Sequence, residues 1–302
     1  MVIFSDNIYL SKPILTHTIP GQVFRPEPVQ GLAVLHDELY LLRRNNLTVY
    51  DAPTLTLQRH LAVDGLVSPY DMASSGVHDC LYMADAAEYD DAANSSDAYI
   101  VHRVEPRGGR TTRWPVKSEP SGLSVTPVGG SVVVTFYKTH SVDEYTTHGQ
   151  LIRTISLSND KLGIVHAVRL SNNQFAVLFR YNKSDDVGGG NGESRPNRVC
   201  VVDVDGNLVH SYGDVIGSTD GQMDRGGRLA VDKSGFVLYA DSNLSQVLLL
   251  SRTLIRVREL VSERNIEAPY WGLDRMCFDE KRGQLYLADF THPDLLSFKV
   301  VE

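Results

Sequence analysis

One pattern recurs six times along the chain, and it restricts the possible folds more than any other feature. Each copy has an apolar segment, a short polar turn, a second apolar segment, a polar loop, and then one or two further apolar segments. The fifth copy is the clearest: GRLAVD, the turn KSG, FVLYAD, the loop SNLS, QVLLLS, the turn RTL and IRVREL. Short segments with partial alternation, separated by turns that contain Gly, Asn or Asp, predict β-strands joined by hairpins.

Four strands in a repeat of ~40–50 residues are typical of a β-propeller blade. We place the six blades approximately at residues 28–61, 69–116, 120–157, 164–213, 226–260 and 272–302. The last copy lacks its fourth strand, whereas the segment 14–18 (ILTHT) precedes the first copy without a blade of its own. The sequence therefore predicts one all-β domain, a six-bladed propeller of four-stranded blades. In this fold the N-terminal strand completes the last blade and closes the ring, which covers an edge that is otherwise prone to pairing.

The segment 227–250 (GRLAVDKSGFVLYADSNLSQVLLL) resembles an NHL repeat, in which an A-V-D strand and a strand ending in A-D flank a polar turn. The chain from about residue 13 to residue 302 resembles the six-bladed NHL-repeat propellers, including the NHL domains of tripartite-motif proteins. The third copy departs from the pattern, with TF where the family has AD, and the first copy has LL. No RING, B-box or coiled-coil segment precedes the repeats, so a ubiquitin-ligase role is not expected.

The composition favours some partners over others. The 302 residues include 29 Lys and Arg against 37 Asp and Glu, a net charge of −8, whereas nucleic-acid binding normally requires a basic excess. No segment approaches the ~18 apolar residues of a membrane span, and the N-terminus lacks the features of a signal peptide. Three widely spaced cysteines without a CxxC motif predict buried free thiols. We therefore expect a cytoplasmic monomer without a membrane partner.

The predicted fold also indicates where a ligand would bind. With the strands of each blade named A to D from the axis outward, the D–A and B–C loops share the face around the channel mouth. Two insertions, residues 86–98 and 180–197, fall in B–C loops of this face. Loops on a rigid scaffold are common binding sites. The candidate ligand-binding residues on this face are Arg44, Tyr70, Asp71, Tyr137, Lys138, His166, Arg180, Arg228, Trp271 and Arg275.

These residues predict a non-catalytic interaction module, with no catalytic residues, cofactor or metal. Arginine and aromatic side chains recur at the centres of protein interfaces, so a protein or peptide segment, or another acidic ligand, is the expected partner. The alternative for each arginine is a purely structural ion pair with a neighbouring carboxylate, and the nearest candidates are Asp85, Asp241 and Asp289.

Two other functions stay open at this stage. Amidating lyases and lactonases, which resemble these propellers, hold zinc or calcium in the channel, so a metal-dependent hydrolase or lyase is one alternative. Here His166 is the single histidine at an expected channel position, with Asp71 and Asp274 as possible oxygen ligands. Binding of single-stranded RNA, which occurs in some tripartite-motif NHL domains, is the other alternative, although the acidic balance opposes it.

Overall fold

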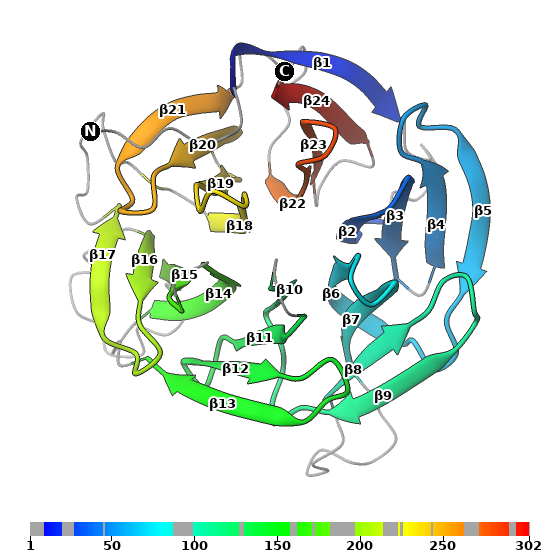
Figure 1. The fold of residues 1–302 in the computed structure, drawn as a ribbon, viewed down its shortest axis with the longest axis horizontal. Helices are drawn as coiled ribbons and strands as arrows, with labels where there is room; N and C mark the ends of the chain where they lie inside the picture. The colour runs from blue at the N-terminus through cyan, green and yellow to red at the C-terminus, as the bar shows by residue number, and fades with distance from the viewer. Residues whose placement is uncertain are drawn as a thin grey trace, which may run out of the picture.

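The protein is a ring of six four-stranded antiparallel sheets arranged around a central axis (Figure 1). This computed structural model describes residues 9–19, 27–44, 46–86, 99–126, 130–157, 162–170, 173–181, 197–213, 223, 226–242, 244–262, 272–289 and 294–301. Within these ranges all regular structure is β-strand. The predicted all-β, six-bladed propeller is therefore confirmed.

In blades one to five the strands follow the order of the sequence from the channel outward. Blade one contains β2 (Val29–Leu35), β3 (Glu38–Arg43), β4 (Asn46–Asp51) and β5 (Leu57–Ala62). Blade two contains β6 (Ser68–Ser75), β7 (Cys80–Ala86), β8 (Tyr99–Val104) and β9 (Thr111–Pro115). Blade three contains β10 (Gly122–Val125), β11 (Val132–Phe136), β12 (Ser141–Tyr145) and β13 (Leu151–Ser156).

The remaining blades repeat this arrangement. Blade four contains β14 (Leu162–Arg169), β15 (Phe175–Tyr181), β16 (Arg198–Val202) and β17 (Leu208–Tyr212). Blade five contains β18 (Gly226–Val231), β19 (Val237–Asp241), β20 (Gln246–Leu250) and β21 (Arg256–Val261). Blade six contains β22 (Leu273–Asp279), β23 (Gln284–Asp289), β24 (Leu295–Val301) and, outermost, β1 (Tyr9–Ile19).

The ring is closed by the first strand of the chain. β1 pairs antiparallel with β24, with Ile14 opposite Lys299 and Thr18 opposite Leu296, so the predicted closure is confirmed. β1 extends beyond the expected segment 14–18 and reaches blade five. There the Tyr9 hydroxyl donates to Asp232 Oδ2 at 3.1 Å, and Arg258 Nη1 donates to the Tyr9 carbonyl at 3.0 Å. The closing strand is therefore bound to two blades.

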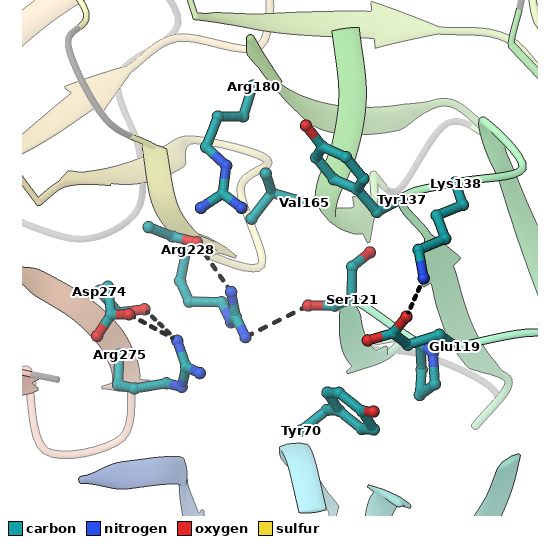
Figure 2. A pocket seen from close by; sticks show the side chains of 12 residues that line it. Tyr70, Glu119, Ser121, Tyr137, Lys138, Val165, Arg180, Arg228, Asp274 and Arg275 are labelled. Atoms are coloured by element: carbon teal, nitrogen blue, oxygen red, sulfur yellow. Dashed lines mark hydrogen bonds and ion pairs between the residues drawn. The ribbon is translucent and has the colours of Figure 1, made fainter. Parts of the chain in front are cut away.

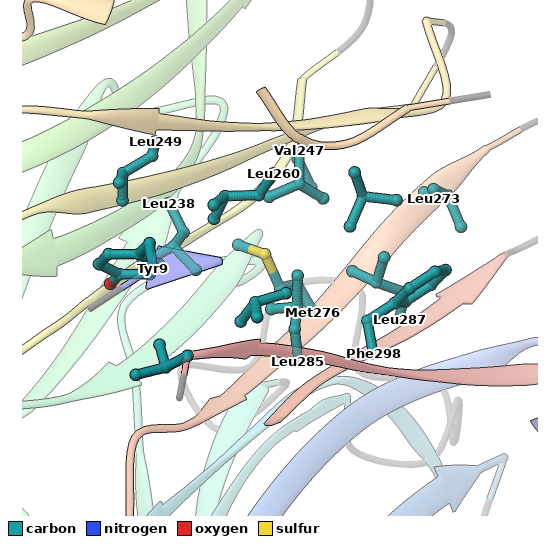
Figure 3. Close-up of a cluster of buried hydrophobic side chains, with 14 of the residues drawn as sticks. Tyr9, Leu238, Val247, Leu249, Leu260, Leu273, Met276, Leu285, Leu287 and Phe298 are labelled. Carbon is teal, nitrogen blue, oxygen red and sulfur yellow. The ribbon is translucent and has the colours of Figure 1, made fainter. Parts of the chain in front are cut away.

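The hydrophobic core is divided among the six junctions between neighbouring blades. Six clusters of buried apolar residues fill these junctions, and Figure 3 shows the one between blades five and six, which includes Tyr9. Every residue of β11 is buried, whereas most residues of the outer strand β13 are exposed. Neighbouring blades cover both faces of a middle strand, which explains the continuous apolar runs in the sequence.

The three cysteines are free, with Cys80 and Cys200 buried and Cys277 half-buried. Cys277 lies beside the narrow channel, where desolvation raises the pKa of its thiol to about 12. Desolvation also raises the pKa of Cys80.

Among the described residues no helix has the length and apolarity needed to cross a bilayer. Most of the two predicted B–C insertions, residues 87–98 and 182–196, lies outside the described residues.

Candidate binding site at the channel mouth

A cavity of about 310 Å³ lies at one end of the channel, where the innermost strands begin and the second strands end. Blades two to six all contribute to its walls. Its lining consists of Tyr70, Glu119, Pro120, Ser121, Tyr137, Lys138, Val165, Arg180, Gly227, Arg228, Asp274 and Arg275. Figure 2 shows that the arginines occupy one side of this cavity and that Lys138, Glu119, Ser121 and Tyr70 occupy the other.

Irregular strand pairing places several of these side chains. In five of the six sheets, the register between the first and second strands shifts close to the mouth, and blade three alone is regular here. Such a bulge leaves extra residues without a ladder partner and redirects their side chains. The residues skipped by the pairing are Gln30, Tyr70, Val165, Gly227, Arg228 and Asp274. All of them except Gln30 line the cavity, so the bulges build much of its wall.

Two of the three arginines are held by neighbouring groups. Arg228 is 5% exposed, and its Nη1 donates to the Gly227 carbonyl at 3.0 Å. Its Nε lies 3.2 Å from Asp71 Oδ2, an ion pair that is not aligned as a hydrogen bond. Arg275 donates from Nε to the Gln30 carbonyl at 2.6 Å and from Nη1 to Asp274 Oδ2 at 3.1 Å. Both guanidinium groups are therefore fixed in position.

Arg180, at the end of β15, differs from the other two arginines. Its guanidinium carbon lies 5.6 Å from the centre of the Tyr137 ring, which is the geometry of a cation–π contact. Within the described part of the chain it forms no hydrogen bond or ion pair. A charged group that lines a cavity without a counterion is available to a ligand.

The opposite side of the cavity carries one ion pair and two aromatic rings. Lys138 Nζ donates to Glu119 Oε2 at 2.7 Å, and the Lys138 side chain is 75% exposed at the rim. Tyr70 and Tyr137 provide apolar ring faces. Burial, followed by the negative charge of Glu119, raises the pKa of Tyr70, so its hydroxyl stays protonated.

The floor of the cavity is a buried cluster of Asp71, His166 and Arg228. Asp71 Oδ2 accepts from the Leu123 amide at 2.9 Å, and Oδ1 accepts from the Met72 amide at 3.0 Å. All three residues line a second cavity of about 180 Å³ in the channel, and Arg228 lines the mouth cavity as well. The cluster therefore separates the mouth from the rest of the channel.

His166 is held as a neutral imidazole. Nδ1 accepts from the Leu229 amide at 3.3 Å, while Nε2 lies 3.2 Å from the Leu123 carbonyl, to which it donates in this tautomer. Burial first, and the positive charge of Arg228 second, lower the pKa of His166 from 6.5 to about 4. Because backbone groups engage both ring nitrogens, this side chain serves the structure of the floor and offers no lone pair to a metal.

The structure places the ten predicted ligand-binding residues in four groups. The first group, which lines the mouth cavity, consists of Tyr70, Tyr137, Lys138, Arg180, Arg228 and Arg275. Asp71 and His166 lie beneath it in the floor cluster. Arg44 is not among the lining residues; it is exposed and lies 3.6 Å from Glu27. Trp271 lies outside the described residues.

The alternative, a structural ion pair for each arginine, holds for Arg228 and Arg275, although their partners are not the carboxylates that the sequence suggested. Asp85 accepts from the Val67 and Ser68 amides and lies 3.1 Å from His102 Nε2, so it anchors the link between blades one and two. Asp241 accepts from the Tyr239 hydroxyl and the Leu244 amide. The carboxylates next to Arg228 and Arg275 are instead Asp71 and Asp274. The side chain of Asp289 lies outside the described residues.

Six lining residues are not among the ten predicted ligand-binding residues: Glu119, Pro120, Ser121, Val165, Gly227 and Asp274. Three of them, Val165, Gly227 and Asp274, enter the wall through bulges, which regular strand alternation does not predict. Among the described residues, no group of three or more His, Cys, Asp or Glu is arranged to hold a metal ion.

Comparison with known proteins supports the architecture alone. No family model matches the chain, and no curated protein matches it by sequence. Many solved structures share its fold. One is the Kuenenia stuttgartiensis hydrazine synthase, with a TM-score of 0.58 and 15% identity over 91% of this chain and 96% of that chain. At this identity the likeness shows the propeller fold and leaves the NHL resemblance a prediction.

Proposed function

We propose that this protein is a non-catalytic interaction module that binds a segment of another protein on the face around the channel mouth. The observation that carries the proposal is the mouth cavity itself, which is lined by two tyrosines and by Arg180, an arginine that has no counterion among the described residues. Arginine and tyrosine are enriched among the side chains that dominate binding energy at interfaces. Propeller scaffolds present such residues rigidly, which lowers the entropic cost of binding.

The size of the cavity also favours a protein segment. A volume of about 310 Å³ is at the lower end of the ~300–1,000 Å³ that small-molecule pockets occupy. It can take one or two side chains of a bound segment, while the rim contacts the rest. Lys138 and Glu119 are partly exposed at this rim and provide polar contacts of both signs.

The NHL assignment is part of the same proposal. It rests on the match of residues 227–250 to the repeat pattern and on the closure of the ring by an N-terminal strand. Closure by the N-terminal strand and four-stranded blades also occur in other propellers, so the sequence match carries the assignment.

The proposal is tested by selecting random twelve-residue peptides displayed on phage against the full chain. Enriched peptides are then measured on a variant with both Tyr70→Ala and Lys138→Ala, which removes two lining side chains without touching an arginine. We expect at least tenfold weaker binding, because truncating a central aromatic hot spot costs ~2 kcal/mol or more and ~1.4 kcal/mol is already tenfold.

The matched control is Arg107→Ala, a change at an exposed residue in the turn between β8 and β9 that does not line the cavity. This control should bind like the original chain. Peptides that bind the double variant as tightly as the original chain would place the interaction elsewhere and refute the proposal.

A further inference from the structure

The three arginines of the mouth cavity differ in how many of their N–H donors already have an acceptor. Arg228 directs Nη1 to the Gly227 carbonyl and Nη2 to the Ser121 carbonyl, the latter at 3.5 Å, and its Nε faces Asp71. Arg275 uses Nε and Nη1, and its Nη2 has no hydrogen-bond acceptor among the described residues. Arg180 lies over the Tyr137 ring and forms no hydrogen bond or ion pair with any described residue. Arg180 and Arg275 therefore hold N–H donors that a ligand can engage.

These donors converge on one part of the cavity. Figure 2 shows the side chains of Arg180, Arg228 and Arg275 extending toward the same region from blades four, five and six. Repulsion between these positive charges affects the pKa of Arg228. Burial lowers its pKa to about 10, and the positive charge of Arg275 is the next cause. A negative group bound between them would relieve this repulsion and accept their hydrogen bonds.

The charge balance of the site indicates how much negative charge it takes. Among the described residues, the cavity and its floor contain four cations, Lys138, Arg180, Arg228 and Arg275, and three carboxylates, Asp71, Glu119 and Asp274. The difference within this set is one positive charge, and Arg180 is its cation without a paired carboxylate. A carboxylate restores neutrality, whereas a phosphate monoester, which carries ≈ −1.5 to −2 at pH 7, leaves an excess of negative charge. The site therefore matches a carboxylate better.

We propose that the mouth cavity is a subsite for the carboxylate of an acidic side chain, Asp or Glu, in the bound segment, with Arg180 as the residue that determines this specificity. Arg275 supplies a second donor, and Arg228 supplies charge from below. Tyr70 and Tyr137 flank the carboxylate and contact the neighbouring apolar atoms of the segment. This inference rests on the proposed function in so far as the carboxylate belongs to a protein segment.

The test uses the full chain and butyrate, which carries the end of a glutamate side chain. The chain is labelled with ¹⁵N-arginine, and the arginine Nε–Hε resonances are followed at constant ionic strength during titration with butyrate, butyramide or inorganic phosphate. We expect saturable binding of butyrate with a Kd on the order of 10 mM, and weaker binding of both butyramide and phosphate. Arg180→Gln should weaken the butyrate affinity about tenfold or more, because a charge-assisted hydrogen bond is lost.

Arg107→Gln serves as the matched control and should leave the butyrate affinity unchanged. The proposal is overturned if butyrate binds no better than butyramide, if Arg180→Gln has no effect, or if phosphate binds more tightly than butyrate. These outcomes are separable from the peptide selection: peptides that need Tyr70 and Lys138 but contain no acidic residue would support the interaction module and reject the carboxylate subsite.

Discussion

The floor cluster provides the sharpest prediction about stability. Asp71 is 4% exposed and is the nearest carboxylate to Arg228, with 3.2 Å between Oδ2 and Nε. Asp71→Asn removes this negative charge and leaves a buried guanidinium without its counterion. Loss of one partner of a buried ion pair typically costs 3–5 kcal/mol. Because Arg228 keeps hydrogen bonds to two carbonyl groups, we expect a cost of about 3 kcal/mol.

The converse substitution should cost less. In Arg228→Met, Asp71 still accepts from the Leu123 and Met72 amides, and the repulsion between Arg228 and Arg275 disappears. We expect a cost of about 1–2 kcal/mol for Arg228→Met. The double variant should recover about half of the stability that Asp71→Asn loses, since a buried ion pair is often replaceable by apolar groups.

The assay is urea unfolding of the four proteins of this double-mutant cycle at pH 7.5, followed by tryptophan fluorescence and circular dichroism. The expected coupling energy between Asp71 and Arg228 is about 3 kcal/mol, so the double variant should cost about 1–2 kcal/mol. Asp274→Asn is the control, because Asp274 is the more exposed carboxylate of the second Arg–Asp pair and should cost about 1 kcal/mol or less. A cost below ~1 kcal/mol for Asp71→Asn, or a double variant no more stable than that single variant, would refute the reasoning.

Three further predictions concern other parts of the molecule. Because the folded-state pKa of His166 is about 4 against 6.5 ordinarily, the unfolded state binds the extra proton as the pH falls from 6.5 to 4. The free energy of unfolding should fall by about 3 kcal/mol over this window, and His166→Gln should flatten this slope. Tyr9→Ala should destabilise the ring by about 3 kcal/mol and Tyr9→Phe by about 1 kcal/mol, measured by urea unfolding; equal costs would show that the ring does not pack as described. The native protein should react slowly with Ellman's reagent at pH 8, since the pKa of Cys277 is about 12, and all three thiols should react after unfolding.

The fold was largely predictable because its signals are local. Strand periodicity and turns with Gly, Asn or Asp are each recognised within a few residues of sequence. Their repetition along the chain can therefore be seen without knowing how the blades pack. Gly206 and Gly235, for example, occupy hairpin turns with positive φ. Closure was predictable because the last copy lacks its fourth strand and a spare strand precedes the first copy. The extension of β1 to Tyr9 was not, because the bonds that hold it come from blade five.

The site was predictable in outline only. The order of the loops predicted that Arg180, Arg228 and Arg275 lie at the channel mouth, where they line the cavity, yet the same reasoning included Arg44, which does not line it. The order of the loops did not predict Val165 as a lining residue, because the register shift in β14 brings this side chain to the cavity wall.

The amino-acid sequence alone determined the number of blades, the four-stranded form of each blade and the strand that closes the ring, since these follow from short-range patterns repeated along the chain. The tertiary structure decided which charges meet. Asp71, His166 and Arg228 come from three different blades, and their partners and burial depend on bulges and on the distance between inner strands. Electrostatic energy depends on separations of a few ångströms in a desolvated interior, and a one-dimensional pattern does not encode them.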